Sequence, residues 1–376
     1  MKKTSLIAAI VLALSPFIIG ALVLNFQNKN DSSQSYDEKV YVAIETEGRV
    51  GVIDAQSKKM IKSIDLSEVQ NSRFVKYTIH NIQVSPDGQK VIATANVDRG
   101  AMGERNRTSE DVTDGLSDKI FVIDPLTDSI LYSIPLEINA HLAHVVVNKS
   151  GNLAYVASQE KGKVYKIDLE AKRIIDNVDI GKNSQPHGLR LSADGSKIFV
   201  ALIEGKAIAA INTSDNSIQN FPMSGSVIQT AVTPDGQYVF GSVYDTKKVA
   251  WIDLSTNEGG YIDLPEDAKG SVQLYTTPDS KYIYVVNQGY YFDQPTGSNV
   301  YRIDINQKKV DQTIAAGDAP HGVVVDKLGK FVYVTNLLSE DVSVIDTATN
   351  KEVARIKVGV MPNGISIWNK KLGGTP

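Results

Sequence analysis

The sequence contains no cysteine among its 376 residues. This absence excludes disulfides, thiol nucleophiles, thiolate metal sites, thioether attachment of haem and a lipidated N-terminal cysteine. Histidine, carboxylate and amide side chains are therefore the groups that remain for binding a metal ion. An excess of positive charge is missing as well, because the formal net charge is -4 and the sequence pI is about 5.8. A chain of this balance has no broad basic footprint, so no nucleic-acid partner is expected.

The common catalytic signatures are missing too. No Gly-x-Ser-x-Gly elbow, phosphate-binding loop, dinucleotide fingerprint or His-Glu-x-x-His motif occurs in the chain. We therefore predict no catalytic residue, and the sequence favours a binding protein over an enzyme. The hydrophobic content of 42% and the charged content of 22% are ordinary for a globular protein.

One long apolar run is present, and it lies at the N-terminus. Leu6 to Leu24 follow Lys2 and Lys3, and a helix of this length spans about 28 Å, close to the thickness of a bilayer core. We expect an N-terminal hydrophobic helix, with residues 1–24 acting as a signal anchor or a signal peptide. Residues 25–38 are polar and are predicted to form a tether. Both alternatives place the body outside the cytoplasm, in a periplasm or at a cell surface, and an uncleaved segment 6–24 would hold it at the membrane.

An internal repeat fills the rest of the chain. A hydrophobic-x-hydrophobic-Ile-Asp phrase, with small variations, occurs in seven copies at intervals of 41 to 70 residues, four of them between 41 and 44, which is the period of a propeller. The copies end at Asp54, Asp124, Asp168, Asn212, Asp253, Asp304 and Asp346. Each copy contains four short β-rich runs separated by Gly, Asn, Asp and Pro, which is the pattern of a four-stranded antiparallel blade. We name these strands a to d, from the inside of the ring outward.

The two ends of the repeat region complete one blade. A turn such as Ser85 to Gly88 joins strands a and b in six copies, whereas in the first copy Ile365 to Ile367 match strand a and Val40 to Ala43 match strand b. We therefore predict an all-β, seven-bladed β-propeller over residues 39–369, closed by its N- and C-terminal strands in one blade, with residues 370–376 as a C-terminal tail. Such closure removes exposed sheet edges.

Loop lengths indicate which face of the ring carries function. The b–c loops and the d-to-a connections lie on one face, the b–c face, and the a–b and c–d turns lie on the other, the a–b face. The c–d turns barely vary, whereas long insertions separate Asn96 from Ile120 and Asn287 from Val300. Loops on the b–c face vary without disturbing the sheets, so we expect ligands or partners there.

All five histidines fall on the b–c face. His80, His187 and His321 occupy one equivalent position at the start of strand a, His144 is offset by one residue, and His141 lies in the same loop. Because His80, His144 and His187 belong to consecutive blades, their side chains are expected to approach one another at the rim of the central channel. These five residues are candidate ligands for a transition metal or a haem. In the Pro-His-Gly turns the alternative is structural, with the imidazole bonding to nearby backbone.

Other polar and aromatic residues have their own interpretations. The Asp that ends each strand c is expected to cap the following turn. Tyr290, Tyr291 and Phe292 in the blade 6 insertion are candidate recognition residues, since loop aromatics often serve binding, and packing over the channel mouth is the alternative. Arg99 and Arg105, in the long b–c loop of blade 2, are further recognition candidates among nearby carboxylates.

The segment Tyr333-Val334-Thr335-Asn336, continued by Asp341 to Asp346 and by Val358-Gly359, resembles the YVTN family of β-propeller repeats. The resemblance implies an exported or cell-surface propeller, related in style to cytochrome-cd-type haem propellers and to amine dehydrogenase propeller subunits. Pro-His-Gly turns are frequent in such repeats, which favours the structural role for His187 and His321. His80 and His144 lack the preceding proline.

Three functions stay open at this point. The first is a binding or scaffold protein that engages a protein partner or a small ligand through the b–c face. The second is a metal- or haem-binding, redox-associated propeller that uses the rim histidines. The third is a lactonase-like hydrolase, for which no catalytic set is identified.

Overall fold

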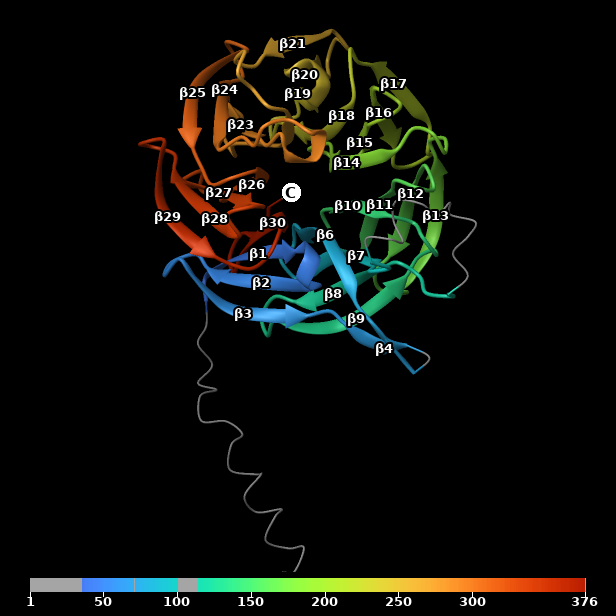
Figure 1. Cartoon of the computed structure of the whole chain (residues 1–376). Coiled ribbons are helices and arrows are strands. Elements are labelled where there is room, and N and C mark those ends of the chain that lie inside the picture. The colour runs from blue at the N-terminus through green and yellow to red at the C-terminus, as the bar shows by residue number, and fades with distance from the viewer. Residues whose placement is uncertain (1–35, 71, 101–113, 376) are drawn as a thin grey trace, which may run out of the picture. The chain divides into compact units, whose positions relative to one another are not determined.

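The computed structural model describes residues 36–70, 72–100 and 114–375. Within them, residues from Asp37 onward form one compact unit, a ring of seven antiparallel blades with a separate two-stranded hairpin (Figure 1). The predicted seven-bladed, all-β architecture is therefore confirmed. The predicted N-terminal helix over 1–24 and almost all of the tether over 25–38 lie outside the described residues. In the part of the chain that is described, no helix has the length and hydropathy to cross a membrane.

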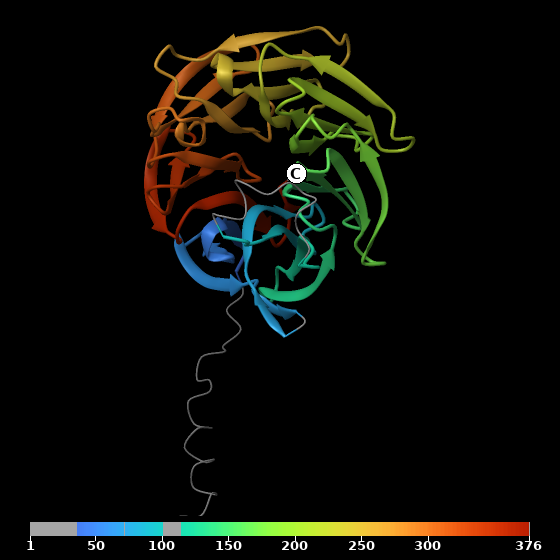
Figure 2. The same cartoon turned by 45° about the vertical axis from the view of Figure 1, so that its right-hand side comes forward.

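The blades follow the chain in order, and each runs from strand a at the channel to strand d at the rim (Figures 1 and 2). Blade 1 contains β30 (Pro362–Asn369), β1 (Glu38–Ile44), β2 (Arg49–Asp54) and β3 (Lys59–Asp65). Blade 2 contains β6 (Tyr77–Val84), β7 (Val91–Val97), β8 (Lys119–Asp124) and β9 (Ser129–Pro135). Blade 3 contains β10 (Leu142–Val147), β11 (Leu153–Ser158), β12 (Lys163–Asp168) and β13 (Arg173–Asp179).

The remaining blades repeat the same order. Blade 4 contains β14 (Pro186–Leu191), β15 (Lys197–Leu202), β16 (Ala207–Asn212) and β17 (Ile218–Pro222). Blade 5 contains β18 (Val227–Val232), β19 (Tyr238–Val243), β20 (Lys248–Asp253) and β21 (Gly259–Asp263). Blade 6 contains β22 (Ser271–Thr276), β23 (Tyr282–Asn287), β24 (Asn299–Asp304) and β25 (Lys309–Ala315). Blade 7 contains β26 (Pro320–Val325), β27 (Phe331–Asn336), β28 (Asp341–Asp346) and β29 (Lys351–Lys357).

The ring closes as predicted, because the N-terminal β1 pairs antiparallel with the C-terminal β30. The residues predicted as a tail contribute a fifth strand, β31 (Gly373–Gly374), which pairs with β30. Gly373 and Gly374 pass so close to the blade 2 turn that a Cβ on either would collide with the carbonyl oxygens of Pro86 or Ser85. Only glycine allows this close approach of two backbones.

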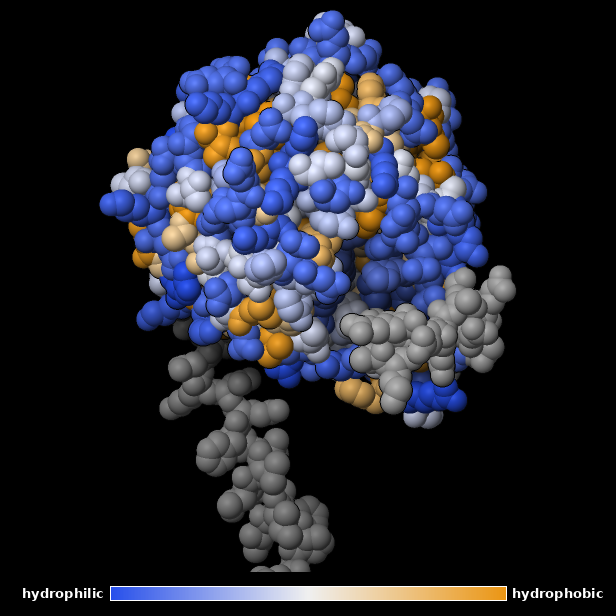
Figure 3. All heavy atoms as spheres, turned by 45° about the horizontal axis from the view of Figure 1, so that its top comes forward, coloured by the Kyte–Doolittle hydropathy of each residue, from blue (hydrophilic) through white to orange (hydrophobic). Residues whose placement is uncertain are grey.

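The core lies in layers between neighbouring blades. Strands a, b and c are rich in β-branched and aromatic residues that are buried on both faces, whereas strands d are mostly exposed. Adjacent blades share hydrophobic clusters, so each blade buries its faces against its neighbours and not alone. Hydrophilic residues dominate the outer surface that Figure 3 shows, and apolar residues form small separate patches on it.

The Asp that ends strand c caps the next turn, as the sequence predicts. Asp54 accepts a hydrogen bond from the Ser57 amide at 2.9 Å, and Asp124 accepts one from the Leu126 amide at 2.8 Å. The remaining copies make equivalent bonds. These residues are structural.

Every complete a–b pair from blade 2 to blade 7 contains a register shift near the b–c end of strand a. In β6 the shift falls between Ile79 and Ile82, and in β10 it falls between Leu142 and Val145. The same shift recurs in β14, β18, β22 and β26. Two residues lie inside each shift, and such a bulge re-aims both side chains. This geometry positions the histidines.

Candidate functional site

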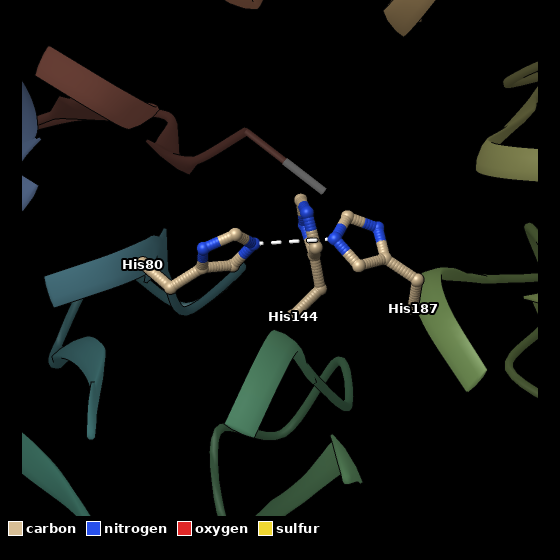
Figure 4. A group of neighbouring side chains, drawn as sticks. All are labelled: His80, His144 and His187. Atoms are coloured by element: carbon tan, nitrogen blue, oxygen red, sulfur yellow. Dashed lines mark hydrogen bonds between the residues drawn. The ribbon is translucent and has the colours of Figure 1, made fainter. Parts of the chain in front are cut away.

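Three histidines meet at the channel end of consecutive blades. His80 lies on β6, His144 on β10 and His187 on β14 (Figure 4). One ligand nitrogen from each ring lies within 4.8 Å of the others. His80 and His187 are the first residues inside their register shifts, and His144 is the second. The one-residue offset of His144 in the repeat is therefore accommodated by the bulge, and its ring still reaches the other two.

The rings of His80 and His187 converge through their Nε2 atoms, and the His144 ring lies close to both. The Nε2 atoms of His80 and His187 are 3.3 Å apart, and the centroid of the His144 ring lies 5.6 Å from that of His80 and 5.0 Å from that of His187. The His144 Nε2 is buried and has no hydrogen-bond partner among the described residues. A buried imidazole nitrogen left without a partner costs about 1–3 kcal/mol, unless something else fills the position.

Each ring is oriented from behind through its Nδ1 atom. The His80 Nδ1 contacts Glu45 Oε1 at 3.3 Å, and the His187 Nδ1 donates to the Ile228 carbonyl at 2.9 Å. The His144 Nδ1 lies 3.2 Å from the amide nitrogen of Gln229. An acceptor at Nδ1 fixes a ring and directs its Nε2 inward, as in metal-binding imidazoles of proteins, and the rings of His80 and His187 have such acceptors.

Burial keeps two of the rings neutral. Burial first, and then the neighbouring His187 and His80, hold the pKa of His144 well below its usual range. Burial and the adjacent His80 lower the pKa of His187 to about 3, although its bond to the Ile228 carbonyl acts in the opposite direction. Neutral imidazole is the form that binds a metal, so at neutral pH neither ring has a second proton to lose before binding.

Glu45 connects the histidines to the neighbouring blades. It lies in η1 (Glu45–Glu47), the b–c loop of blade 1, and its Oε2 accepts hydrogen bonds from the Asn363 amide at 2.8 Å and the Tyr291 hydroxyl at 3.2 Å. Burial raises the pKa of this carboxyl, but the bonds from His80 and Asn363 outweigh that effect and lower it to about 2. Glu45 is thus an anion at neutral pH and stabilises positive charge on or beside His80.

The geometry fits a single metal ion. Bonds of 2.0–2.1 Å from a tetrahedral metal to two nitrogens place those nitrogens about 3.3 Å apart, which matches the separation of the His80 and His187 Nε2 atoms. Three protein nitrogens leave further coordination positions for a small ligand. A haem does not fit between these rings, because their centroids are only 5.0–5.6 Å apart and leave no slot for the macrocycle.

The other two histidines stay outside this group. His321, on β26, is buried, and its Nδ1 contacts the Gln288 amide nitrogen at 2.5 Å. His141 is exposed, has a left-handed backbone at φ 48°, and its ring centroid lies 6.4 Å from that of His80. Neither belongs to the set of convergent ligand atoms found among the described residues.

Of the predicted recognition residues, one contacts the histidine site, and the others that are described do not. Tyr291, in η3 (Tyr290–Phe292), joins the site, since its hydroxyl bonds Glu45 and its ring packs edge-on against His321 at 5.6 Å. Phe292 stacks on Tyr244 at 3.6 Å, which is packing, and Tyr290 is exposed. Arg99 binds Asp114 and the Leu116 carbonyl at the base of its own loop. Arg105 lies outside the described residues.

Two features of this face were not predicted. Glu45 and Gln229 hold the histidine rings, and neither was singled out from the sequence, although Gln229 aligns with His144 in the repeat. The long connection from blade 1 to blade 2 forms a hairpin, β4 (Glu68–Gln70) and β5 (Arg73–Val75), that projects beyond the rim of the ring (Figures 1 and 2). In the sequence, only the length of the d-to-a connection between Ile64 and His80 indicates an extra element here.

Fold and site together define a β-propeller with a three-histidine cluster at one end of its channel. A family model described as YNCE-like beta-propeller matches residues 90–371, so the chain belongs to that family. The match agrees with the YVTN-type repeats recognised in the sequence. No match was found among curated proteins.

Solved structures share the fold. The structure titled Kuenenia stuttgartiensis Hydrazine Synthase matches with a TM-score of 0.62 and 18% sequence identity, over 79% of this chain and 94% of that one. A protein from Lactobacillus plantarum matches with a TM-score of 0.66 and 16% identity, over 88% of this chain and 99% of that one. At these identities the likeness concerns the fold alone.

Proposed function

We propose that this propeller binds a transition metal ion on its b–c face, through the Nε2 atoms of His80, His144 and His187. The observation that carries the proposal is the convergence of three rings whose Nδ1 atoms are already held by Glu45, Gln229 and the Ile228 carbonyl. Three imidazoles favour Zn²⁺, Cu²⁺, Ni²⁺ or Co²⁺ over the hard ions Ca²⁺ and Mg²⁺. A bound ion would supply Lewis acidity at an open coordination position.

The His144–Gln229 contact adds a condition to this proposal. Gln229 Oε1 accepts from the Thr230 amide at 2.9 Å, so its amide nitrogen faces the His144 Nδ1, which must act as the acceptor. A metal at Nε2 requires the proton on Nδ1, and Gln229 must then turn its oxygen towards the ring. Metal loading therefore involves rotation of the Gln229 carboxamide.

Metal titration of the purified protein tests this function. Metal-free protein should bind about one Co²⁺ or Zn²⁺ per chain, with the visible spectrum of Co²⁺ as the readout, and His80→Ala/His144→Ala/His187→Ala should abolish binding. His141→Ala is the matched control, because that ring lies on the same face but outside the cluster. Wild-type protein without metal affinity, or a triple variant with unchanged affinity, would overturn the proposal.

A second candidate function is docking of a protein partner on the b–c face, and the hairpin β4–β5 favours it. Val69 and Phe74 are directly paired across the hairpin, and the two residues are 72% and 73% exposed. Exposed apolar pairs on a projecting element commonly contact an apolar patch of another protein. The proposed occupant is a folded partner that covers this pair.

Proximity labelling in the native host, followed by binding measurements with the purified partner, tests this docking. The partner should lose at least about tenfold in affinity for Val69→Ser/Phe74→Ser, because both apolar contacts vanish. Leu126→Ser, an exposed apolar residue on a c–d turn of the opposite face, should leave the affinity unchanged. Equal loss in both variants would show that the hairpin has no specific role.

The location remains a proposal as well. The apolar run over 6–24 supports a site outside the cytoplasm, and detection of the protein in periplasmic or surface fractions tests it. The lactonase-like alternative stays a sequence-based prediction.

A further inference from the structure

A cavity lies at the opposite end of the channel from the histidines. Its volume is about 350 Å³, within the range of small-molecule pockets. Strand a runs from the b–c face to the a–b face, and the cavity is lined by the far ends of β6, β10, β14, β18, β22 and β26. Thr375, whose carbonyl accepts a hydrogen bond from Gln83 Nε2 at 2.5 Å, lines it as well.

Arg190 is the central polar group of this cavity. It follows His187 by three residues on β14, and its Nη1 donates to the Leu189 carbonyl at 3.0 Å. Its guanidinium lies 5.6 Å from the centre of the Tyr275 ring. No carboxylate of the described residues forms an ion pair with it, and burial lowers its pKa. Four of its five N–H donors have no acceptor in the described part of the chain, so a bidentate acceptor is the ligand that suits it.

Other charges around the cavity add to the positive potential. Lys327 and Lys149 line the cavity and form no ion pair among the described residues, and burial lowers the pKa of Lys327. Asp326 is the one carboxylate among the lining residues. Its oxygens accept bonds from the amides of Leu328, Lys330 and Phe331, so they are committed to the blade 7 turn. The lining thus carries three cationic side chains and one carboxylate, which is already hydrogen-bonded to backbone amides.

The remaining walls are largely apolar. They are formed by valine, alanine, leucine and proline side chains of strand a and the a–b turns, among them Val146, Val232, Val325, Pro86 and Pro278. An inorganic anion would leave this apolar surface uncovered, and an uncharged hydrophobic molecule would supply no acceptor for the N–H donors of Arg190 that lack one among the described residues. A ligand with a carboxylate at one end and an apolar body satisfies both requirements.

We propose that the cavity on the a–b face binds a small amphiphilic carboxylate, with the carboxylate on Arg190 and the apolar body against the ends of strands a. The site is separate from the histidine cluster and uses none of its residues. Its ligand class therefore does not depend on whether the histidines bind a metal.

Calorimetric titration of the full chain with octanoate tests this inference, in the presence of a chelator so that metal plays no part. Wild-type protein should bind octanoate saturably, and Arg190→Gln should weaken binding by at least about tenfold, since a hydrogen bond to a charged group is lost. Arg173→Gln, an exposed arginine on the outer strand β13, is the matched control and should bind like the wild type.

Two further probes separate the contribution of the ligand's charge from that of its apolar body. Octan-1-ol has the same body without the charge, and inorganic phosphate has charge without the body, so both should bind at least about tenfold more weakly than octanoate. Equal affinity of Arg190→Gln and wild type for octanoate, or octan-1-ol binding as tight as octanoate, would overturn the proposal. If Arg190→Gln does not fold, as judged by circular dichroism, Lys327→Gln provides the second test, with a smaller loss expected.

Discussion

The Nε2 atoms of His80 and His187 lie 3.3 Å apart, although the two residues are 107 positions apart in the chain. The His187 Nδ1 donates to the Ile228 carbonyl, so its Nε2 carries the lone pair and must accept. His80 is then the donor to His187, while its Nδ1 also faces the Glu45 carboxylate. A proton thus lies where a metal ion would lie.

The first prediction concerns this proton. Binding of Zn²⁺ should release about one proton per chain, because the metal replaces the proton between His80 and His187. Calorimetry in buffers of different ionisation enthalpy measures the release, and zinc affinity should fall as the pH is lowered. A binding enthalpy that is the same in all buffers would contradict the replacement.

The second prediction concerns Glu45. Glu45→Gln should weaken zinc binding about ten- to hundredfold, because the carboxylate that orients His80 and supports its charge is lost. Glu47→Gln, in the same short helix, is the matched control, since Glu47 bonds the Val360 amide and not a histidine. Competition with a chromogenic chelator measures both affinities. Equal losses in the two variants would point to a general effect of charge and not to the Glu45–His80 contact.

The third prediction tests the packing behind His144. A Cβ on residue 188 would collide with the Gln229 side chain and approach its backbone, so Gly188→Ala should displace Gln229 from His144. We expect a loss of about 1–3 kcal/mol in unfolding free energy together with weaker zinc binding. Gly51→Ala, whose new methyl group would meet only the ends of flexible side chains, should cost less. Urea denaturation and zinc titration check the pair.

The fourth prediction concerns the pH dependence of stability. Burial first, and then the nearby His80, lower the pKa of His321 to about 3, although the Glu45 carboxylate acts in the opposite direction. The unfolded chain binds a proton at this residue below about pH 6.5, whereas the folded chain does so only near pH 3. Stability should therefore fall by up to about 1.4 kcal/mol per pH unit from this residue as the pH drops from 6.5 towards 3.

The variant His321→Leu should lose that part of the dependence. Its unfolding free energy, measured in urea between pH 7 and pH 4, should fall less steeply than that of the wild type. His141→Leu removes an exposed imidazole and should keep the wild-type slope. Parallel slopes for all three proteins would show that His321 is not held neutral by burial.

The fifth prediction concerns ring closure. Lys39, on the N-terminal β1, forms a buried ion pair at 2.8 Å with Asp128 in the c–d turn of blade 2, and Tyr41 donates to the same carboxylate. Lys39→Ala should destabilise the fold by about 3–5 kcal/mol, because Asp128 is left charged and buried. Lys39→Ala/Asp128→Ala should recover part of the loss. Thermal unfolding of the single and double variants measures the difference.

The repeat made the ring predictable. The repeated phrase that ends at Asp54 and at its six equivalents indicates the order of the strands. The two chain ends match two strands of one blade, and this match predicts that the ring closes there. The sequence also predicted that His80 and His187 lie at the same end of the channel, because equivalent strand positions lie at equivalent places around it. Contacts between residues of different blades could not be predicted from the sequence. Glu45 bonds Asn363 over 318 positions, and no local pattern distinguishes it from other loop carboxylates.

Three channel residues at the far end share one position of the repeat. Arg190, Gln83 and Tyr275 occupy one equivalent position in their strands a, three residues after the histidine position. In most proteins an arginine in a strand is a surface residue, so its placement inside the channel became clear only from the register.

Each strand a of blades 2 to 7 presents the same bulged pair of residues at the b–c end of the channel, whatever side chains it carries. The ring therefore offers equivalent backbone positions at which ligand side chains can be introduced by design. Replacing Ile228 or Val272 with histidine would add an imidazole at a backbone position already shaped to hold one. A single scaffold could in this way be reprogrammed, one module at a time, to present ligand sets of chosen number and spacing.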